Sequence, residues 1–151
     1  MGFGLYVHVP FCSSICPFCP YNKVVARDDL ARRYFASLAR EIAWYVDALT
    51  SVGRGPFTSL YIGGGTPTLY PEQVARIIAS IPTSGERAIE VLPLHGTPER
   101  LDVLAEAGIT AVSIGAQSFH DPVLRRLRRP HTAAHSLAAV ENALPRFDCV
   151  D

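Results

Sequence analysis

The chain has 151 residues, 48% of them hydrophobic, and its 14 basic residues balance 14 acidic ones. This length and composition predict one globular domain with a core and exclude a disordered chain, while the zero net charge argues against a nucleic-acid or membrane partner. No apolar run reaches the ~20 residues of a membrane span, and the N-terminus lacks the features of a signal peptide, so we expect a cytoplasmic protein.

The first predicted strand covers residues 4–9, where apolar residues alternate up to Pro10. A cysteine-rich loop follows. Apolar residues at helical spacing then predict a helix over residues 28–53, capped by Asp28 or Asp29 and ended by Gly53. The predicted buried face of this helix comprises Leu30, Tyr34, Leu38, Ile42, Tyr45 and Leu49.

Strands and helices continue to alternate after residue 53. In chain order, the patterns predict a strand at 57–65, a helix at 71–81, a strand at 87–93, a helix at 97–108, a strand at 109–117, helices at 121–127 and 132–144, and a strand at 147–151. The predicted caps of the last three helices are Thr97, Asp121 and Thr132.

This alternation predicts right-handed βαβ units and a parallel sheet. We therefore expect an α/β fold, a partial (β/α) barrel with parallel strands that is open and truncated after about five strands. Because residues 147–151 end the chain inside a predicted strand, we expect residues 1–151 to be the N-terminal part of a longer domain whose C-terminal part is absent. We expect the four histidines after residue 90 to serve surface or capping roles, namely His95, His120, His131 and His135.

Three cysteines with C-x3-C-x2-C spacing lie in the loop after the first strand: Cys12, Cys16 and Cys19. A structural zinc site needs four ligands, so His8 or the distant Cys149 would have to supply the fourth. Iron–sulfur clusters are held by cysteine thiolates, and three thiolates on a 4Fe–4S cluster leave one iron free to bind a small molecule. The loop also lies at the carboxyl end of a strand, where parallel α/β folds bind ligands, so the pattern favours a cluster over zinc.

The cysteine spacing, with Phe18 before the last cysteine, resembles the signature of the radical S-adenosylmethionine (SAM) superfamily. The segments "YVHVPFCSSICPFC", "YIGGGTPT" and "SIGAQSFHDPVLRRLRRPH" resemble the group that contains oxygen-independent coproporphyrinogen III oxidase and the related haem chaperone. This resemblance covers essentially the whole chain. It implies that the three cysteines bind a 4Fe–4S cluster and that the open iron binds S-adenosyl-L-methionine, which an electron from the cluster cleaves to a 5′-deoxyadenosyl radical.

The glycine-rich segment after the second strand is by itself a tight turn, but absent side chains also let a ligand approach the backbone. The resemblance implies that Gly64, Gly65 and Thr66 contact the methionine part of SAM. Glu90 places a carboxylate in an otherwise apolar strand, which is costly unless the group is paired or exposed. The resemblance implies that Glu90 binds SAM as well.

Gln117 ends the fourth predicted strand and should face the same edge of the sheet as the cysteines, because parallel strands present their carboxyl ends together. Arg129 matches an arginine of the family and carries a guanidinium suited to a ligand carboxylate or ribose. Asp151 matches an aspartate that meets the nucleoside. The resemblance also implies that Tyr6 and Phe18 lie beside the cofactor. We interpret the rest of the basic cluster as a solvated face: Arg125, Arg126 and Arg128.

Two departures from the family pattern leave the activity open. Tyr21 stands where coproporphyrinogen oxidases usually have a further cysteine, and Leu92 replaces the usual asparagine in "EVLPLHG". The resemblance therefore implies an oxidase-like radical SAM enzyme, a haem-binding chaperone or a radical methyltransferase. Its substrate would be a porphyrinogen, haem or natural product, and its electron donor a protein such as flavodoxin or ferredoxin. A non-enzymatic, zinc-stabilised α/β module is the alternative of a different class.

Overall fold

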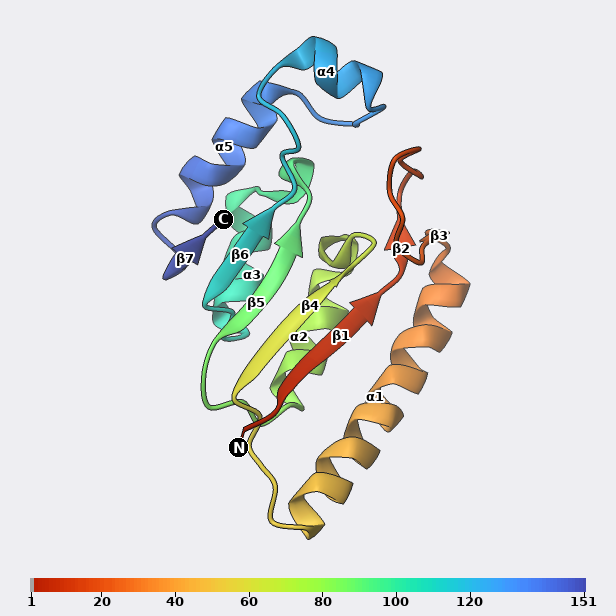
Figure 1. Cartoon of the computed structure of the whole chain (residues 1–151), viewed down its shortest axis with the longest axis vertical. Coiled ribbons are helices and arrows are strands. Elements are labelled where there is room, and N and C mark those ends of the chain that lie inside the picture. The colour runs from red at the N-terminus through yellow and green to blue at the C-terminus, as the bar shows by residue number, and fades with distance from the viewer. Residues whose placement is uncertain (1) are drawn as a thin grey trace.

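A parallel sheet of five strands forms the centre of the computed structural model, which describes residues 2–151 (Figure 1). All four strand pairings are parallel, which confirms the predicted fold class. The strands lie side by side in the order in which they occur in the sequence. Within residues 2–151 the two edge strands, β1 and β7, do not pair with each other, so the barrel is open. The strands in this order are β1 (Gly4–Val9), β4 (Ser59–Gly64), β5 (Arg87–Val91), β6 (Ala111–Ile114) and β7 (Cys149–Val150).

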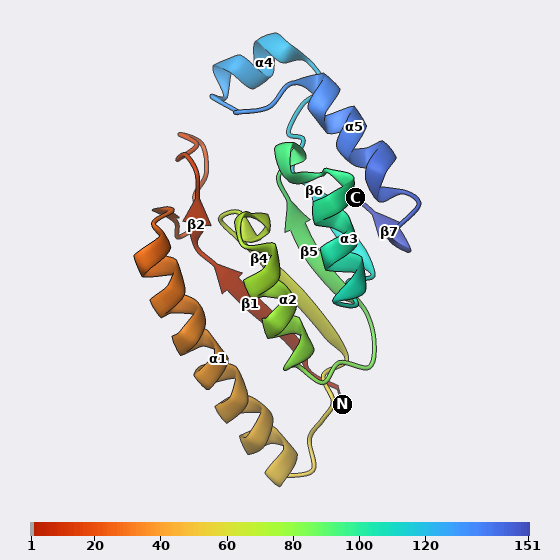
Figure 2. The ribbon, with the colours of Figure 1, turned by 180° about the vertical axis from the view of Figure 1, so that it is seen from behind.

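Helices cover one face of the sheet and leave the other open, as the view from behind shows (Figure 2). The covering helices are α1 (Asp28–Ser51), α2 (Pro71–Ala79) and α3 (Pro98–Glu106). Beyond the carboxyl ends of the strands lie α4 (Asp121–Arg126) and the 3-10 helices η1 (Pro67–Leu69) and η2 (Pro93–His95). Helix α5 (Ala133–Ala143) runs back toward β7 and packs against α3, β6 and η2. Among the described residues, no helix is both long and apolar enough to cross a lipid bilayer.

The core lies between the sheet and the covering helices. Alternate strand residues point into it and are 3% exposed or less, namely Val7, Val9, Leu60, Ile62, Ile89 and Val91. The residues between them point to the open face, where Tyr6 and Tyr61 are exposed and stack with ring centroids 6.1 Å apart. This alternation follows from the strand repeat of two and gives the sheet one apolar face and one polar, aromatic face.

Helix α1 packs through a face that matches the predicted one in part, because the predicted Tyr34 and Leu49 also pack against the core. Its buried residues are Ala31, Phe35, Leu38 and Ile42, whereas Leu30 and Tyr45 are exposed. Apolar residues surround much of this helix, so its periodicity is compatible with two overlapping faces. The aromatic ring of Phe11 packs against both faces, with its centroid 5.3 Å from that of Tyr34 and 6.4 Å from that of Phe35.

The cap predicted for α1 was also wrong. The N-cap position is Arg27, without a side-chain cap bond, and both aspartates lie in the first turn. Arg27 instead forms an ion pair of 3.0 Å with Asp29. Acidic residues in a first helical turn still stabilise the helix through its dipole.

Asp121 caps α5 rather than α4, because its Oδ1 accepts a hydrogen bond of 2.8 Å from the backbone N–H of Ala133. The predicted cap Thr132 is confirmed and forms a capping box with His135.

His131 does not have the expected surface or capping role. It is only 3% exposed, and its Nε2 donates a hydrogen bond of 3.0 Å to the carbonyl of Ala116. These contacts join the end of β6 to both following helices.

Candidate cofactor site

The cysteine loop is closed by a short parallel pairing that the sequence analysis did not predict. Strand β2 (Phe11–Cys12) pairs with β3 (Val24–Val25), and the N–H of Ala26 donates to the carbonyl of Cys12 at 2.8 Å. Cys12 therefore sits at the base of the loop, where burial raises the pKa of its thiol. A hydrogen bond with the side chain of Thr66 opposes this rise in pKa.

Lys23 shapes the projecting part of the loop and was missed in the sequence analysis. Its Nζ donates to the carbonyl oxygens of Cys19 at 2.6 Å and Tyr21 at 3.1 Å. The N–H of Cys19 also donates to the carbonyl of Cys16 at 3.2 Å, so the segment is a hydrogen-bonded turn. The signal that could have found Lys23 is its uniqueness, because it is the only lysine of the chain.

His8 connects the loop to β1. Its Nε2 lies 2.9 Å from the carbonyl oxygen of Asn22 and must donate to it, so Nδ1 accepts from the hydroxyl of Tyr6 at 3.0 Å. Both ring nitrogens are engaged, and Cys149 lies on β7 at the far edge of the sheet. Within residues 2–151, no three His, Cys, Asp or Glu side chains are grouped to hold a single metal ion. Neither residue considered as a fourth zinc ligand is therefore placed to act as one.

The glycines at the end of β4 press directly against the backbone that leads to Cys12. A Cβ atom on Gly65 would lie 2.6 Å from the carbonyl oxygen of Phe11 and 2.8 Å from the carbonyl carbon of Pro10. Gly64 has φ +119, in the region that favours glycine. The absence of side chains at Gly64 and Gly65 thus allows the end of β4 to contact the backbone at the end of β1 and the start of β2. This contact forms one wall of the site.

The carboxylate of Glu90 is satisfied by two donors. Its Oε2 accepts from the N–H of Gly64 at 3.1 Å, and its Oε1 accepts from the hydroxyl of Tyr61 at 3.3 Å. These bonds explain how β5 accommodates a carboxylate. Burial, and then the negative charge of Glu90, raise the pKa of Tyr61. Tyr61, which the sequence analysis missed, is thus held as a neutral donor that orients this carboxylate.

Arg129 bridges the end of β6 and the cysteine loop. Its Nη2 donates to the carbonyl of Gly115 at 2.8 Å, and its Nη1 lies 3.4 Å from the Sγ of Cys16. Its Nε is buried and has no hydrogen-bond partner among the described residues. A buried donor without a partner is costly, so this nitrogen marks a place for an acceptor.

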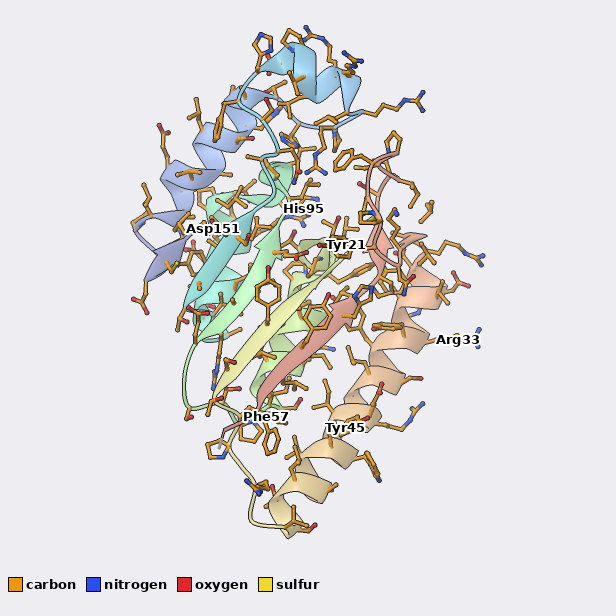
Figure 3. The ribbon with its side chains drawn as sticks, viewed as in Figure 1. Tyr21, Arg33, Tyr45, Phe57, His95 and Asp151 are labelled. Atoms are coloured by element: carbon orange, nitrogen blue, oxygen red, sulfur yellow. The ribbon has the colours of Figure 1, made fainter. Side chains whose placement is uncertain are left out.

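A cavity of about 340 Å³ brings most of the predicted site residues together at the carboxyl edge of the sheet. Tyr6 and Asp151 do not line it: Tyr6 is bonded to His8, which does not line it either, and Asp151 accepts a hydrogen bond of 3.3 Å from the lining residue Ser113. In Figure 3, Tyr21 lies on the cysteine loop and Asp151 near β7. The predicted residues that do line the cavity are Cys12, Cys16, Phe18, Cys19, Gly64, Gly65, Thr66, Glu90, Gln117 and Arg129.

The lining of this cavity fits a thiolate-held cluster with a small molecule beside it. Three sulfur donors come from one loop, which is the ligand chemistry of an iron–sulfur cluster. The opposite wall offers a carboxylate for a cation and an unsatisfied guanidinium nitrogen for an anion. The convergence expected from the sequence is confirmed, whereas the role of each residue in binding stays a prediction.

His95 in η2 supports this edge of the sheet and lies at the carboxyl end of β5 (Figure 3). Its Nδ1 is 3.0 Å from the Oγ1 of Thr68, a fully buried residue of η1, and Arg100 donates to the carbonyl of Thr68 at 2.6 Å. The expected surface or capping role of His95 is therefore wrong. Burial, and then the positive charge of Arg100, lower the pKa of His95 to about 4.

We expect the apoprotein to lose about 1–2 kcal/mol of stability through His95 as the pH falls from 6.5 to about 4. The unfolded chain binds a proton with the ordinary pKa of 6.5, whereas the folded chain resists protonation until about pH 4. The contribution is therefore complete above pH 6.5 and is lost below it. Urea unfolding at several pH values should show a shallower slope in this window for His95→Gln. The exposed control His120→Gln should retain the parental slope.

Comparison with known proteins relates this arrangement to one superfamily. The family model described as "Radical SAM superfamily" matches residues 6–151. The heme chaperone HemW of Bacillus subtilis is 32% identical over 146 residues, which cover 91% of this chain and 38% of HemW. The oxygen-independent coproporphyrinogen III oxidase of Pseudomonas aeruginosa is 34% identical over 150 residues, which cover 93% of this chain and 32% of the oxidase.

The fold of this chain recurs within a larger solved structure. Coproporphyrinogen III oxidase from Escherichia coli, described as a radical SAM enzyme, superimposes with a TM-score of 0.86 at 31% identity. The superposition covers 99% of this chain and 36% of that structure. The chain thus spans between 32% and 38% of the length of these three relatives.

Proposed function

Because the chain belongs to the radical SAM superfamily, we propose that it binds a 4Fe–4S cluster and promotes the reductive cleavage of S-adenosyl-L-methionine. The observation that carries this proposal is that Cys12, Cys16 and Cys19 line one cavity with the polar groups suited to SAM. When bound, the cluster supplies the electron for cleavage of the sulfonium. Residues 1–151 would then form the first part of a radical SAM core domain.

The residues of the cavity wall have complementary tasks in this proposal. The Glu90 carboxylate, held by its two donors, would bind the amino group of SAM, and Arg129 would bind the carboxylate. Gly64, Gly65 and Thr66 would let the methionine part approach the backbone. The nucleoside part would meet the remaining predicted residues, namely Tyr6, Phe18, Gln117 and Asp151.

Anaerobic reconstitution with iron and sulfide tests this function. We expect a brown protein whose absorption is bleached by dithionite, and which forms 5′-deoxyadenosine when SAM and a reductant are added. A colourless protein with one stoichiometric zinc would instead support the non-enzymatic zinc-stabilised module.

The change Glu90→Gln is expected to weaken SAM binding by roughly 10- to 100-fold, because a hydrogen bond to a charged group contributes about 1.5–3 kcal/mol. Glutamine keeps the shape of the side chain but removes the negative charge. Anaerobic calorimetry on the reconstituted protein measures the affinity. Glu72→Gln on α2 removes the same charge away from the cavity and should leave the affinity unchanged. Equal affinities for all three proteins would assign Glu90 a purely structural role.

A haem-binding function within the same family is the second candidate. The similarity to HemW favours it, together with the tyrosine at position 21, which is exposed at the rim of the cavity. Spectroscopic titration with haem tests this candidate, whereas conversion of a porphyrinogen would indicate an oxidase and methyl transfer to a natural product would indicate a methyltransferase. In each case we propose a flavodoxin- or ferredoxin-type electron donor.

A further inference from the structure

The charges of this neutral chain are unevenly distributed. Residues 8–27 and 113–135, which form much of the rim of the cavity, contain six basic residues and one acidic residue. The rest of the chain contains eight basic and thirteen acidic residues. The six basic residues of the rim segments are Lys23, Arg27, Arg125, Arg126, Arg128 and Arg129.

Three of these arginines have exposed side chains and form no ion pair within residues 2–151: Arg125, Arg126 and Arg128. The acidic residue of the rim, Asp121, is engaged in capping α5. Positive charge on this part of the rim is therefore not neutralised locally, and it creates a field that attracts anionic surfaces.

The turn that carries the exposed arginines lies close to Cys16, a proposed cluster ligand. The N–H of Arg129 donates to the carbonyl of Leu124 at 2.9 Å, and the N–H of Arg128 donates to the carbonyl of Arg125 at 3.0 Å. This turn holds the Arg129 side chain against Cys16. Figures 1 and 2 agree in placing α4 beside the tip of the cysteine loop.

Apolar side chains accompany the charges. Ile15 on the cysteine loop is 45% exposed, Phe119 just before α4 is 58% exposed, and Val123 in its first turn is 41% exposed. Apolar residues combined with arginine are typical of protein interfaces. A nucleic acid would be expected to meet a basic surface without such apolar side chains.

We propose that α4, the turn after it and the tip of the cysteine loop form the docking surface for a small acidic electron-carrier protein. This proposal rests on the proposed function. The carrier loses one electron and the cluster gains it. Of the arginines here, only Arg129 lines the cavity, so the other three cannot contact a small molecule that has entered it. A protein stops at the rim, where those three residues lie.

The test compares cluster reduction rates in reconstituted proteins. The change Arg125→Glu/Arg126→Glu should slow anaerobic reduction by an acidic flavodoxin hydroquinone at least about tenfold at low salt, because it reverses the attraction that guides the encounter. The difference should shrink at about 1 M salt, where charges act over only about 3 Å. The control Arg40→Glu/Arg76→Glu changes the net charge by the same amount on α1 and α2. Flavodoxin should reduce its cluster at the parental rate.

Reduction by photoreduced 5-deazaflavin, a neutral small molecule, separates the outcomes. The docking surface would be supported by two results together. The parent, Arg125→Glu/Arg126→Glu (the α4 variant) and Arg40→Glu/Arg76→Glu (the outer-helix variant) should be reduced at equal rates by this reductant, and only the α4 variant should be reduced more slowly by flavodoxin. No cluster in the parent protein would instead contradict the proposed function. Unchanged flavodoxin rates in the α4 variant, or equal slowing in the outer-helix variant, would overturn the docking surface. So would binding of a short DNA duplex that the α4 variant loses while its flavodoxin rate is unchanged.

Discussion

Replacing Cys16 with alanine is expected to abolish binding of the iron–sulfur cluster, whereas replacing Cys149 should leave it intact. The three loop thiols line one cavity, and loss of one leaves two ligands, too few to hold the cluster firmly. Cys149 is exposed on β7 and does not line the cavity. Iron and sulfide contents after anaerobic reconstitution, together with the visible absorption, measure the effect.

Cys149→Ala is a matched control, because it removes one thiol from the same chain and leaves the loop unchanged. Its iron content should equal that of the parent protein. If both variants lost iron to the same extent, Cys149 would be a ligand and a four-ligand zinc site would have to be considered again.

Replacing Gly65 with alanine is expected to lower the free energy of unfolding by about 3 kcal/mol and to reduce the iron content. The new Cβ would lie 2.6–2.9 Å from backbone atoms of Pro10 and Phe11. Backbone cannot move away as the end of a flexible side chain can, so the segment that carries Cys12 must shift. Urea unfolding of the apoprotein measures the stability, and reconstitution measures the effect on the cluster.

Gly115→Ala is the control for this change at the same cavity. Its Cβ would lie 3.5 Å from the nearest atom, the Nη2 of Arg129, which is ordinary van der Waals contact. We expect its stability to change by less than about 1 kcal/mol. Parental stability in the Gly65 variant would show that β2 tolerates displacement and that the close approach is not required.

The parallel sheet could be predicted because its five strands and the five α-helices each show a recognisable repeat of apolar residues. Alternation of the two element types then leaves few topologies, and the parallel sheet follows. The face of α1 was harder, since its apolar residues occur on more than one side. Phe11 contacts Tyr34 on the predicted face as well as Phe35 on the observed one, so the buried stripe of α1 overlaps both.

The candidate site was predictable where a residue type is itself informative. Three cysteines in one loop, glycines after a strand and a carboxylate in an apolar strand each signal chemistry or a special backbone. The supporting contacts were not predictable, because they depend on how the loop folds back. The bonds from His8 to Asn22 and from Tyr61 to Glu90 join residues far apart in the sequence. The bonds from Lys23 are local but require the turn that the loop makes.

The match between spatial and sequence order in the sheet has a consequence for synthesis on the ribosome. Each new strand can dock on the edge left by the previous one, so the sheet can grow vectorially as the chain emerges. The cysteines leave the exit tunnel well before the glycines at 64 and 65 that wall them, and Arg129 arrives later still. The lining of the cavity is therefore complete only after residue 129 has been synthesised, and the proposed cluster ligands precede the rest of their wall.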